Sequence, residues 1–359
     1  MISPPLTPLF RGAIIPAYST ERVLFMLEFV SVWANERFGI VGSVILFAIG
    51  LVALIKGGDW FVDGSVGIAK KFHVPELLIG ATVVSIGTTL PEVMVSATSA
   101  AKGISSIAYG NAIGSVICNT ALIAAITVAV RPAKVNRKAL TLPVVCFFVA
   151  ALFYAGVAVI KREFTRPVGI ILLCMFVVYM VLTVLHAKRH PEESEAEDAA
   201  GSAGVGKSIL FLLLGAVLIA VGANFLVDNG TVIARALGVP ETVIALTFVA
   251  LGTSLPELVT AITSLVKGHG ALSLGNVIGA NIFNLVLVSG MAVTIKPFAL
   301  PAEKLIGGMN ASLIIDMPVM LLVMAVLTLP AVFSGKLRRW QGVLLLGVYA
   351  AFVAFQFIG

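Results

Sequence analysis

The sequence has few charged residues. Asp, Glu, Lys and Arg make up only 12% of its 359 residues, whereas they make up about 25% of a typical soluble domain. Hydrophobic residues reach 59%. Apolar runs recur from residue 40 onward, each of about 20 residues, which is enough to cross the roughly 30 Å hydrocarbon core of a bilayer. This composition excludes a cytosolic enzyme, a disordered chain and a nucleic-acid binder, and it predicts a polytopic membrane protein.

Cysteine and histidine are scarce as well. The three cysteines, Cys118, Cys146 and Cys174, lie in apolar runs without CxxC spacing, so we interpret them as small buried hydrophobic residues and not as disulfides or metal ligands. The four histidines are expected in loops, where solvent is their default environment. They are His73, His186, His190 and His269.

We expect an all-α polytopic membrane protein with about ten transmembrane helices. Residues 1–38 are interrupted by prolines and charges and are expected to form an N-terminal tail, which could include an interfacial helix. Residues 188–206 contain the acidic run EESEAED and are expected to form a hydrophilic linker between two halves, 39–187 and 207–359. The expected spans are 40–70, 76–102, 107–130, 139–160, 166–187, 207–236, 241–266, 272–295, 309–329 and 338–358.

The net charge of +6 is explained by membrane topology, because Lys and Arg collect in loops that stay in the cytoplasm. The loops on the side of the linker hold more Lys and Arg than the side that carries the termini. We therefore expect a multi-pass protein of the cell membrane, with a cytoplasmic linker and both termini outside.

The chain contains an internal repeat. Residues 74–120 align without gaps on residues 239–285 at a constant offset of 165 positions, and 21 of the 47 aligned positions are identical. Matches at this offset continue upstream, among them Asp63 with Asp228, for which both a gating and an interfacial role stay open. The repeating unit is therefore about five spans. Because five is odd, the second copy enters the membrane from the opposite face, which is the inverted-repeat plan of many secondary transporters.

Each copy places one glutamate deep in an apolar helix. Glu92 lies 16 residues after Glu76 and 10 before Lys102, which puts it near mid-bilayer at about 1.5 Å per residue. Glu257 is its counterpart in the second copy. A carboxylate at that depth costs at least about 2.5–3.5 kcal/mol when it has no partner, so two of them at matched depth indicate a functional site.

The residues before each glutamate add oxygen ligands. Pro91 has no N–H to donate, so it frees the carbonyl of Gly87 and kinks the helix. Thr88 and Thr89 lie four and three residues before Glu92 and share its face of the helix. Carboxylate, hydroxyl and carbonyl oxygens are the ligands of hard cations such as Ca²⁺ and Na⁺. The second copy repeats the arrangement with Gly252, Thr253, Ser254, Pro256 and Glu257.

A second polar element follows in each copy. Asn111, Ser115 and Asn119 are spaced four residues apart and form one stripe on a helix. We interpret Ser115 and Asn119 as further cation ligands, together with Asn284 of the second copy. Asparagine stripes also hold membrane helices together, so a packing role stays open for Asn111 and its counterpart Asn276. Four glycines are spaced for close helix contact: Gly110, Gly114, Gly275 and Gly279.

These motifs resemble those of a known transporter family. GTTLPE with GNAIGSVICN, and GTSLPE with GNVIGANIFN, are similar to the paired α-repeats of the cation/calcium exchanger superfamily, specifically its sodium/calcium exchanger branch of prokaryotic type. The resemblance covers the apolar chain from residue 40 to the end. It implies ten helices, antiport of Ca²⁺ and Na⁺ by alternating access, and ion sites formed by the second, third, seventh and eighth spans.

The resemblance also implies that Glu92 and Glu257 bind both Ca²⁺ and Na⁺. Two ionised carboxylates carry a charge of about −2, which one Ca²⁺ or two Na⁺ would match, and any further Na⁺ would make the exchange electrogenic. Two positions depart from the family pattern. Ala280 replaces a frequent Ser, and Asn284 stands where potassium-dependent relatives have Asp, which argues against K⁺ co-transport. The full predicted ligand set is Gly87, Thr88, Thr89, Glu92, Ser115, Asn119, Gly252, Thr253, Ser254, Glu257 and Asn284.

Other functions are considered beside exchange for Na⁺. A Ca²⁺/H⁺ exchanger would use the same glutamates as proton carriers, but protons would need none of the surrounding hydroxyls and carbonyls. A passive cation channel would normally show rings of residues from subunit symmetry. An intramembrane protease would need a nucleophile with a base, an Asp dyad or the HExxH motif, which the chain lacks.

We therefore expect a transporter and not an enzyme. No cofactor, nucleic acid or obligatory protein partner is expected. The expected partners are the lipid bilayer and the transported ions, Ca²⁺ and Na⁺.

Overall fold

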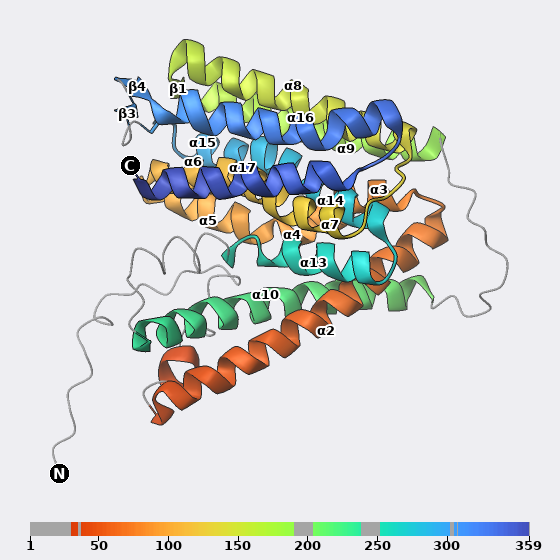
Figure 1. Cartoon of the computed structure of the whole chain (residues 1–359), viewed down its shortest axis with the longest axis vertical. Helices are drawn as coiled ribbons and strands as arrows, with labels where there is room; N and C mark the ends of the chain where they lie inside the picture. Colours follow the sequence, from red (N-terminus) through yellow and green to blue (C-terminus); the bar gives the residue numbers. More distant parts are fainter. Residues whose placement is uncertain are drawn as a thin grey trace.

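The molecule is a bundle of long helices that run side by side (Figure 1). The computed structural model describes residues 30–34, 37–189, 204–237, 252–301, 305–306 and 308–358. Within these residues, seven helices are long and apolar enough to cross a membrane, and a pair of helices bent by 48°, Glu76–Thr88 with Leu90–Ala101, is an eighth candidate. The seven are Ile40–Phe72, Ser105–Val130, Arg137–Lys161, Arg166–Arg189, Val205–Gly230, Gly270–Ile295 and Ser312–Ser334.

Two of the ten expected spans are not among these eight candidates. The last one, 338–358, corresponds to the helix α17 (Arg339–Ile358). The seventh, 241–266, is described only from residue 252 onward. Most of the expected tail (1–38) and linker (188–206) lies outside the described residues, although residues 30–34 of the tail are helical. The structure is mostly helical, as expected.

Several of the helices contain a π-helical stretch, in which backbone hydrogen bonds join residues five apart and not four apart. The first half contains α2 (Ile40–Phe72), α3 (Glu76–Ile79), η2 (Gly80–Val84), α4 (Ser85–Thr88), α5 (Leu90–Ala101), α6 (Ser105–Cys118), η3 (Asn119–Ala124), α7 (Ala125–Val130), α8 (Arg137–Lys161) and α9 (Arg166–Arg189). The second half contains α10 (Val205–Ala236), α13 (Leu255–Val266), α14 (Gly270–Phe283), η5 (Asn284–Val288), α15 (Ser289–Ile295), η6 (Ser312–Asp316), α16 (Met317–Ser334) and α17.

Short strands lie in the connections outside the apolar spans. The strands β1 (Glu163–Phe164) and β2 (Phe298–Ala299) pair antiparallel, as do β3 (Leu305–Ile306) and β4 (Met309–Asn310). Each strand has two residues. These pairs leave the helical architecture unchanged.

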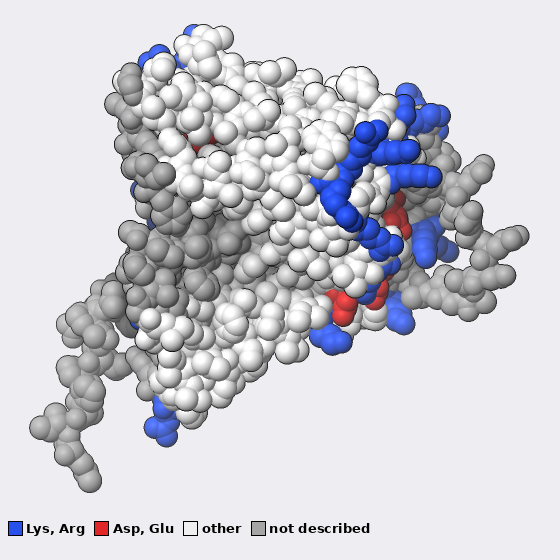
Figure 2. All heavy atoms as spheres, in the orientation of Figure 1, with Lys and Arg blue, Asp and Glu red and all other residues white. Residues whose placement is uncertain are grey.

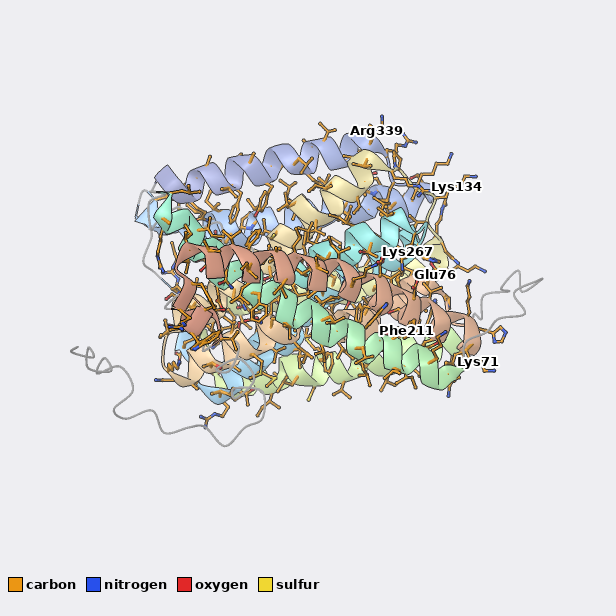
Figure 3. The ribbon with its side chains drawn as sticks, turned by 90° about the horizontal axis from the view of Figure 1, so that it is seen from below. Lys71, Glu76, Lys134, Phe211, Lys267 and Arg339 are labelled. Carbon is orange, nitrogen blue, oxygen red and sulfur yellow. The ribbon has the colours of Figure 1, made fainter. Side chains whose placement is uncertain are left out.

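The end of the bundle at which α9 ends and α10 begins is called the linker face. Lys and Arg gather at this end, with a few acidic residues among them (Figure 2). Lys71, Glu76, Lys134, Lys267 and Arg339 all lie there (Figure 3). This arrangement agrees with the excess of positive charge expected on the side of the linker.

The helices α2 and α10 pack antiparallel through glycines. A Cβ atom at Gly57 would lie 3.0 Å from the carbonyl oxygen of Gly215, and one at Gly215 would lie 2.8 Å from that of Gly57. Gly50 and Gly222 form a second reciprocal pair one heptad away. Because Gly50 and Gly57 correspond to Gly215 and Gly222 at the repeat offset of 165, equivalent helices of the two copies contact each other through equivalent residues.

Two expectations about scarce residues need correction. The cysteines are free, as predicted, but only Cys118 is buried, and Cys174 is exposed because it lies on an outer face of α9. His186 lies within α9 and not in a loop. His269 contacts Glu76, with 2.8 Å between Nδ1 and Oε1, so solvent is not its main partner.

We expect that Gly215→Leu destabilises the protein. The added side chain would meet the backbone of Phe61 and Gly57, and overpacking of this kind costs about 1–3 kcal/mol. The apparent melting temperature of the purified protein, followed by size-exclusion chromatography after heating, should fall by several degrees. Gly156→Leu is the matched control, because no described atom lies within 4 Å of a Cβ there. Equal melting temperatures for the two variants would contradict the glycine contact.

Candidate cation-binding centre

Both candidate glutamates lie in the first turn of a helix, directly after a proline. The chain leaves α4 at Thr88, and α5 begins at Leu90 with Pro91 in its first turn. Glu92 follows in the same turn. In the second copy, Glu257 likewise lies in the first turn of α13, directly after Pro256. Both glutamates are fully buried.

The two halves of the chain contact each other's glutamates. Thr89 donates a hydrogen bond from Oγ1 to Oε1 of Glu257, at 3.3 Å. Ser254, the equivalent of Thr89, lies beside the carboxylate of Glu92. Each hydroxyl therefore belongs to one copy of the repeat and faces the glutamate of the other copy. Neither copy alone forms the surroundings of its own glutamate.

A second reciprocal contact joins threonines to asparagines. Thr88 donates to Oδ1 of Asn276 at 3.2 Å, and Thr253 donates to Oδ1 of Asn111 at 3.3 Å. The two bonds are equivalent at the offset of 165. A hydroxyl whose hydrogen is donated in this way keeps its oxygen lone pairs available for another partner. The bond therefore orients each threonine oxygen as an acceptor, which is what a cation requires.

Asn111 and Asn276 hold the helices around the glutamates. Asn111 donates from Nδ2 to the carbonyl oxygen of Glu92 at 3.1 Å and to Oγ of Ser96 at 2.9 Å. Asn276 accepts through Oδ1 from Ser85 at 3.3 Å as well as from Thr88. These contacts favour the packing interpretation that the sequence left open for both asparagines.

Ser85 and Ser96 were not predicted from the sequence. A signal was available, since Ser85 lies four residues before Thr89 and Ser96 lies four residues after Glu92. Residues four apart share a helix face, so both serines lie on the face of the candidate ligands. Their counterparts in the second copy are alanines, which is why the repeat alone did not mark them.

Several of the buried polar atoms without a hydrogen-bond partner belong to the glutamates and to other predicted ligands. Both carboxylate oxygens of Glu92, Oε2 of Glu257 and the hydroxyl of Ser254 have no partner among the described residues, and neither do the side-chain amides of Asn119 and Asn284. A buried polar group that is left unpaired costs about 1–3 kcal/mol, and more when it is charged. The unpaired carboxylate oxygens of the two glutamates are the costliest of these, and a bound cation would pair with them.

The two asparagines stand at equivalent irregularities of their helices. Asn119 begins the π-helical stretch η3 after α6, and Asn284 begins η5 after α14. Single π-helical turns occur often at functional sites, because they turn side chains and backbone carbonyls away from the regular helical pattern. Both side chains are fully buried. Ser115 lies one turn before Asn119 and is also buried.

The remaining predicted ligands lie at the edge of this centre. Gly87, Gly252 and Thr253 are half-buried, whereas Thr88 and Thr89 are buried. A cavity of about 10 Å³ adjoins the centre, between the α2–α10 pair, the end of α4 and the first turns of α5 and α13. Thr88, Pro91 and Pro256 line it. This volume is enough for about one water molecule.

Comparison with known proteins identifies the family. A family model described as "Sodium/calcium exchanger protein" matches residues 42–185 and 207–358. The chain belongs to this family. The match covers both halves that the sequence predicted and leaves out the acidic linker between them. It agrees with the resemblance seen in the repeated motifs.

Several relatives of known sequence or structure are similar over most of their length. The sodium/calcium exchanger MaX1 of Methanosarcina acetivorans is 30% identical over 352 residues, covering 88% of this chain and 98% of that protein. An uncharacterized membrane protein of Methanocaldococcus jannaschii is 36% identical over 308 residues, covering 86% and 96%. A structure of the sodium-calcium exchanger NCX_Mj soaked with Na⁺ and Sr²⁺ has a TM-score of 0.75 at 32% identity, covering 88% of this chain and 99% of that one.

We expect that Glu92→Gln stabilises the ion-free protein and removes its response to Ca²⁺. The substitution deletes a buried charge that has no partner among the described residues, and a buried unpaired charge is costly. In chelator without Na⁺, the melting temperature of the variant should exceed that of the wild type. Added Ca²⁺ should raise the melting temperature of the wild type only, because a ligand stabilises the state that binds it. A variant that still responds to Ca²⁺ would argue against Glu92 as a ligand.

Proposed function

We propose that this protein exchanges Ca²⁺ for Na⁺ across the membrane by alternating access. The observation that supports the proposal best is the group of buried, unpartnered oxygens around Glu92 and Glu257. They are contributed by both halves of the chain, and they are carboxylate, hydroxyl and amide oxygens, which suit hard cations. A transporter must bind its cargo at such a point between two parts that can move relative to each other.

In this proposal, the charge of the centre couples the two ions. Two carboxylates carry about −2 when ionised, which one Ca²⁺ or two Na⁺ would neutralise, and a third Na⁺ would make the exchange electrogenic. Because the two ions share ligands, they compete for the centre. In an empty centre the two ionised carboxylates would have no compensating charge, and keeping them buried during the change of access would be costly. The loaded forms therefore change access more readily than the empty one. The proposed ligands are Gly87, Thr88, Thr89, Glu92, Ser115, Asn119, Gly252, Thr253, Ser254, Glu257 and Asn284.

The proposal includes two inverted repeats of five helices each, 39–187 and 207–359, joined by the linker 188–206. The antiparallel contact of α2 with α10 supports it, because equivalent segments that run in opposite directions are expected of inverted copies. The reciprocal bonds from Thr88 to Asn276 and from Thr253 to Asn111 support it as well. An approximate two-fold axis in the membrane plane would relate the two copies.

The proposal predicts that uptake of ⁴⁵Ca²⁺ into proteoliposomes requires a Na⁺ gradient directed outward. Vesicles loaded with Na⁺ should accumulate Ca²⁺, and vesicles loaded with K⁺ should not. Glu92→Gln should reduce the initial rate at least about a hundredfold, because losing one charge-assisted interaction with a buried ion costs about 3 kcal/mol or more. Glu163→Gln is the control for loss of a carboxylate, since Glu163 is exposed in the α8–α9 turn.

Two outcomes would change the assignment. Uptake that follows a pH gradient and ignores Na⁺ would replace the proposal with Ca²⁺/H⁺ exchange through the same glutamates. Uptake that needs no counter-ion gradient and does not saturate would indicate a passive channel. The hydroxyls of Thr89 and Ser254, which face the glutamates, favour Na⁺ over H⁺, because a proton needs no such set of ligands.

A further inference from the structure

An ion pair ties α2 to α13 at the linker face. Nζ of Lys267 lies 2.8 Å from Oδ1 of Asp63 and 3.5 Å from Oδ1 of Asp59. The same ammonium donates to the backbone oxygen of Asp59 at 3.0 Å. Lys267 follows α13 directly, so the pair joins the helix that carries Glu257 to the long outer helix α2.

Both members of this pair recur in the other copy of the repeat. Lys102 corresponds to Lys267, and Asp228 corresponds to Asp63. Lys102 follows α5 in the same way that Lys267 follows α13, at the face of the bundle opposite the linker. In the described part of the chain, Lys102 is exposed and forms no ion pair.

The packing of the helices shows the same asymmetry. The helix α2 packs along α13, where Gly58 of α2 lies against Val259 and Thr263. The equivalent contact would be that of α10 with α5, and these two helices barely touch in the described residues. Two copies with similar sequences therefore differ in conformation at the same place. Among the described residues, α2 is packed on α13, whereas α10 has hardly any contact with α5.

We propose that these lysines form two alternating ion-pair latches, one at each face of the membrane. In the arrangement seen here, Lys267 holds the linker face together through Asp63 and Asp59. In the opposite arrangement, Lys102 pairs with Asp228 and the Lys267 contact opens. Lys267 and Lys102 act as positioning residues, since neither lies in the cation centre. This inference rests on the proposed exchange by alternating access.

The latch at the linker face is the stronger of the two. Asp59 corresponds to Asn224, which donates to the backbone of its own helix at Ala220, so Lys102 would meet one carboxylate where Lys267 meets two. A further contact, His269 with Glu76 at 2.8 Å, also closes the linker face. Its histidine has no counterpart, because the equivalent of His269 is Ile104. The arrangement with the linker face latched is therefore the preferred one.

The latches are tested by access to a reporter cysteine from each side of the membrane. We would place Ala220→Cys in the cavity beside the centre, in a chain whose three native cysteines are replaced by alanine. A membrane-impermeant methanethiosulfonate reagent is added to inside-out and to right-side-out vesicles, and the labelling rate is measured. The labelling rate does not require transport, so it tests the latches separately from the exchange.

The latch proposal predicts shifts of opposite sign for equivalent substitutions. Lys267→Gln should raise labelling from the linker face about two- to fivefold, as expected for loss of a half-exposed ion pair, and lower it from the other face. Asp63→Asn should do the same, and the double variant should add nothing further. Lys102→Gln should shift both rates in the reverse direction, by a smaller factor. The reciprocal exchange Asp63→Lys with Lys267→Asp should restore the wild-type rates.

Either of two results would overturn the latches. One is that Lys102→Gln and Lys267→Gln shift labelling in the same direction, as general loosening of the fold would. The other is that neither shifts it while both variants elute as folded protein from a sizing column. If wild-type vesicles show no Na⁺-driven Ca²⁺ uptake but the opposite shifts are observed, the latches stand and the proposed cargo is wrong.

Discussion

The cost of two buried carboxylates constrains the rest of the structure. Glu92 and Glu257 are fully buried, and the ion pairs of Lys267 and His269 lie at the linker face, away from both glutamates. A charge held in a low dielectric without a partner is unstable, so the compensating charge has to come from solution. Under the proposed function, that charge is the cargo itself. Occupancy of the centre then decides whether the protein can change its access, and this ties the movement of one ion to that of the other.

The fold meets this constraint by dividing the centre between two copies of one unit. The hydroxyl that faces each glutamate comes from the other copy, and so does the asparagine that orients each threonine. The polar atoms left without partners also come from both copies. A relative movement of the copies would therefore change the solvent access of the whole centre at once. Glycines where α2 meets α10 allow the two outer helices to approach backbone to backbone, without long side chains that would lock them together.

The sequence predicted those features that depend on local pattern and on the repeat. The offset of 165 located the equivalent glutamates, and the proline after each Gly-Thr pair predicted the helix break that the structure has at Thr89. The sequence did not predict the contacts between the two copies. The contacts of Thr88 with Asn276 and of Gly57 with Gly215 could not be predicted, because they depend on how two segments far apart in sequence are placed in space. His269 shows the same limit, since a histidine in a short turn gave no sign of its contact with Glu76.

The difference between the two copies follows from the same reasoning. Similar sequences favour similar packing, so a chain in which α2 is bound to α13 while α10 is released from α5 has a second arrangement of comparable energy available, with the roles exchanged. Half-exposed ion pairs such as Lys267 with Asp63 contribute only about 0.2–1 kcal/mol, and the unmatched contact of His269 adds a bias of similar size. These terms are small beside the cost of leaving two carboxylates uncompensated. Under the proposed function, the proposed latches therefore choose between arrangements of nearly equal energy, while the bound cation determines whether the protein can move between them at all.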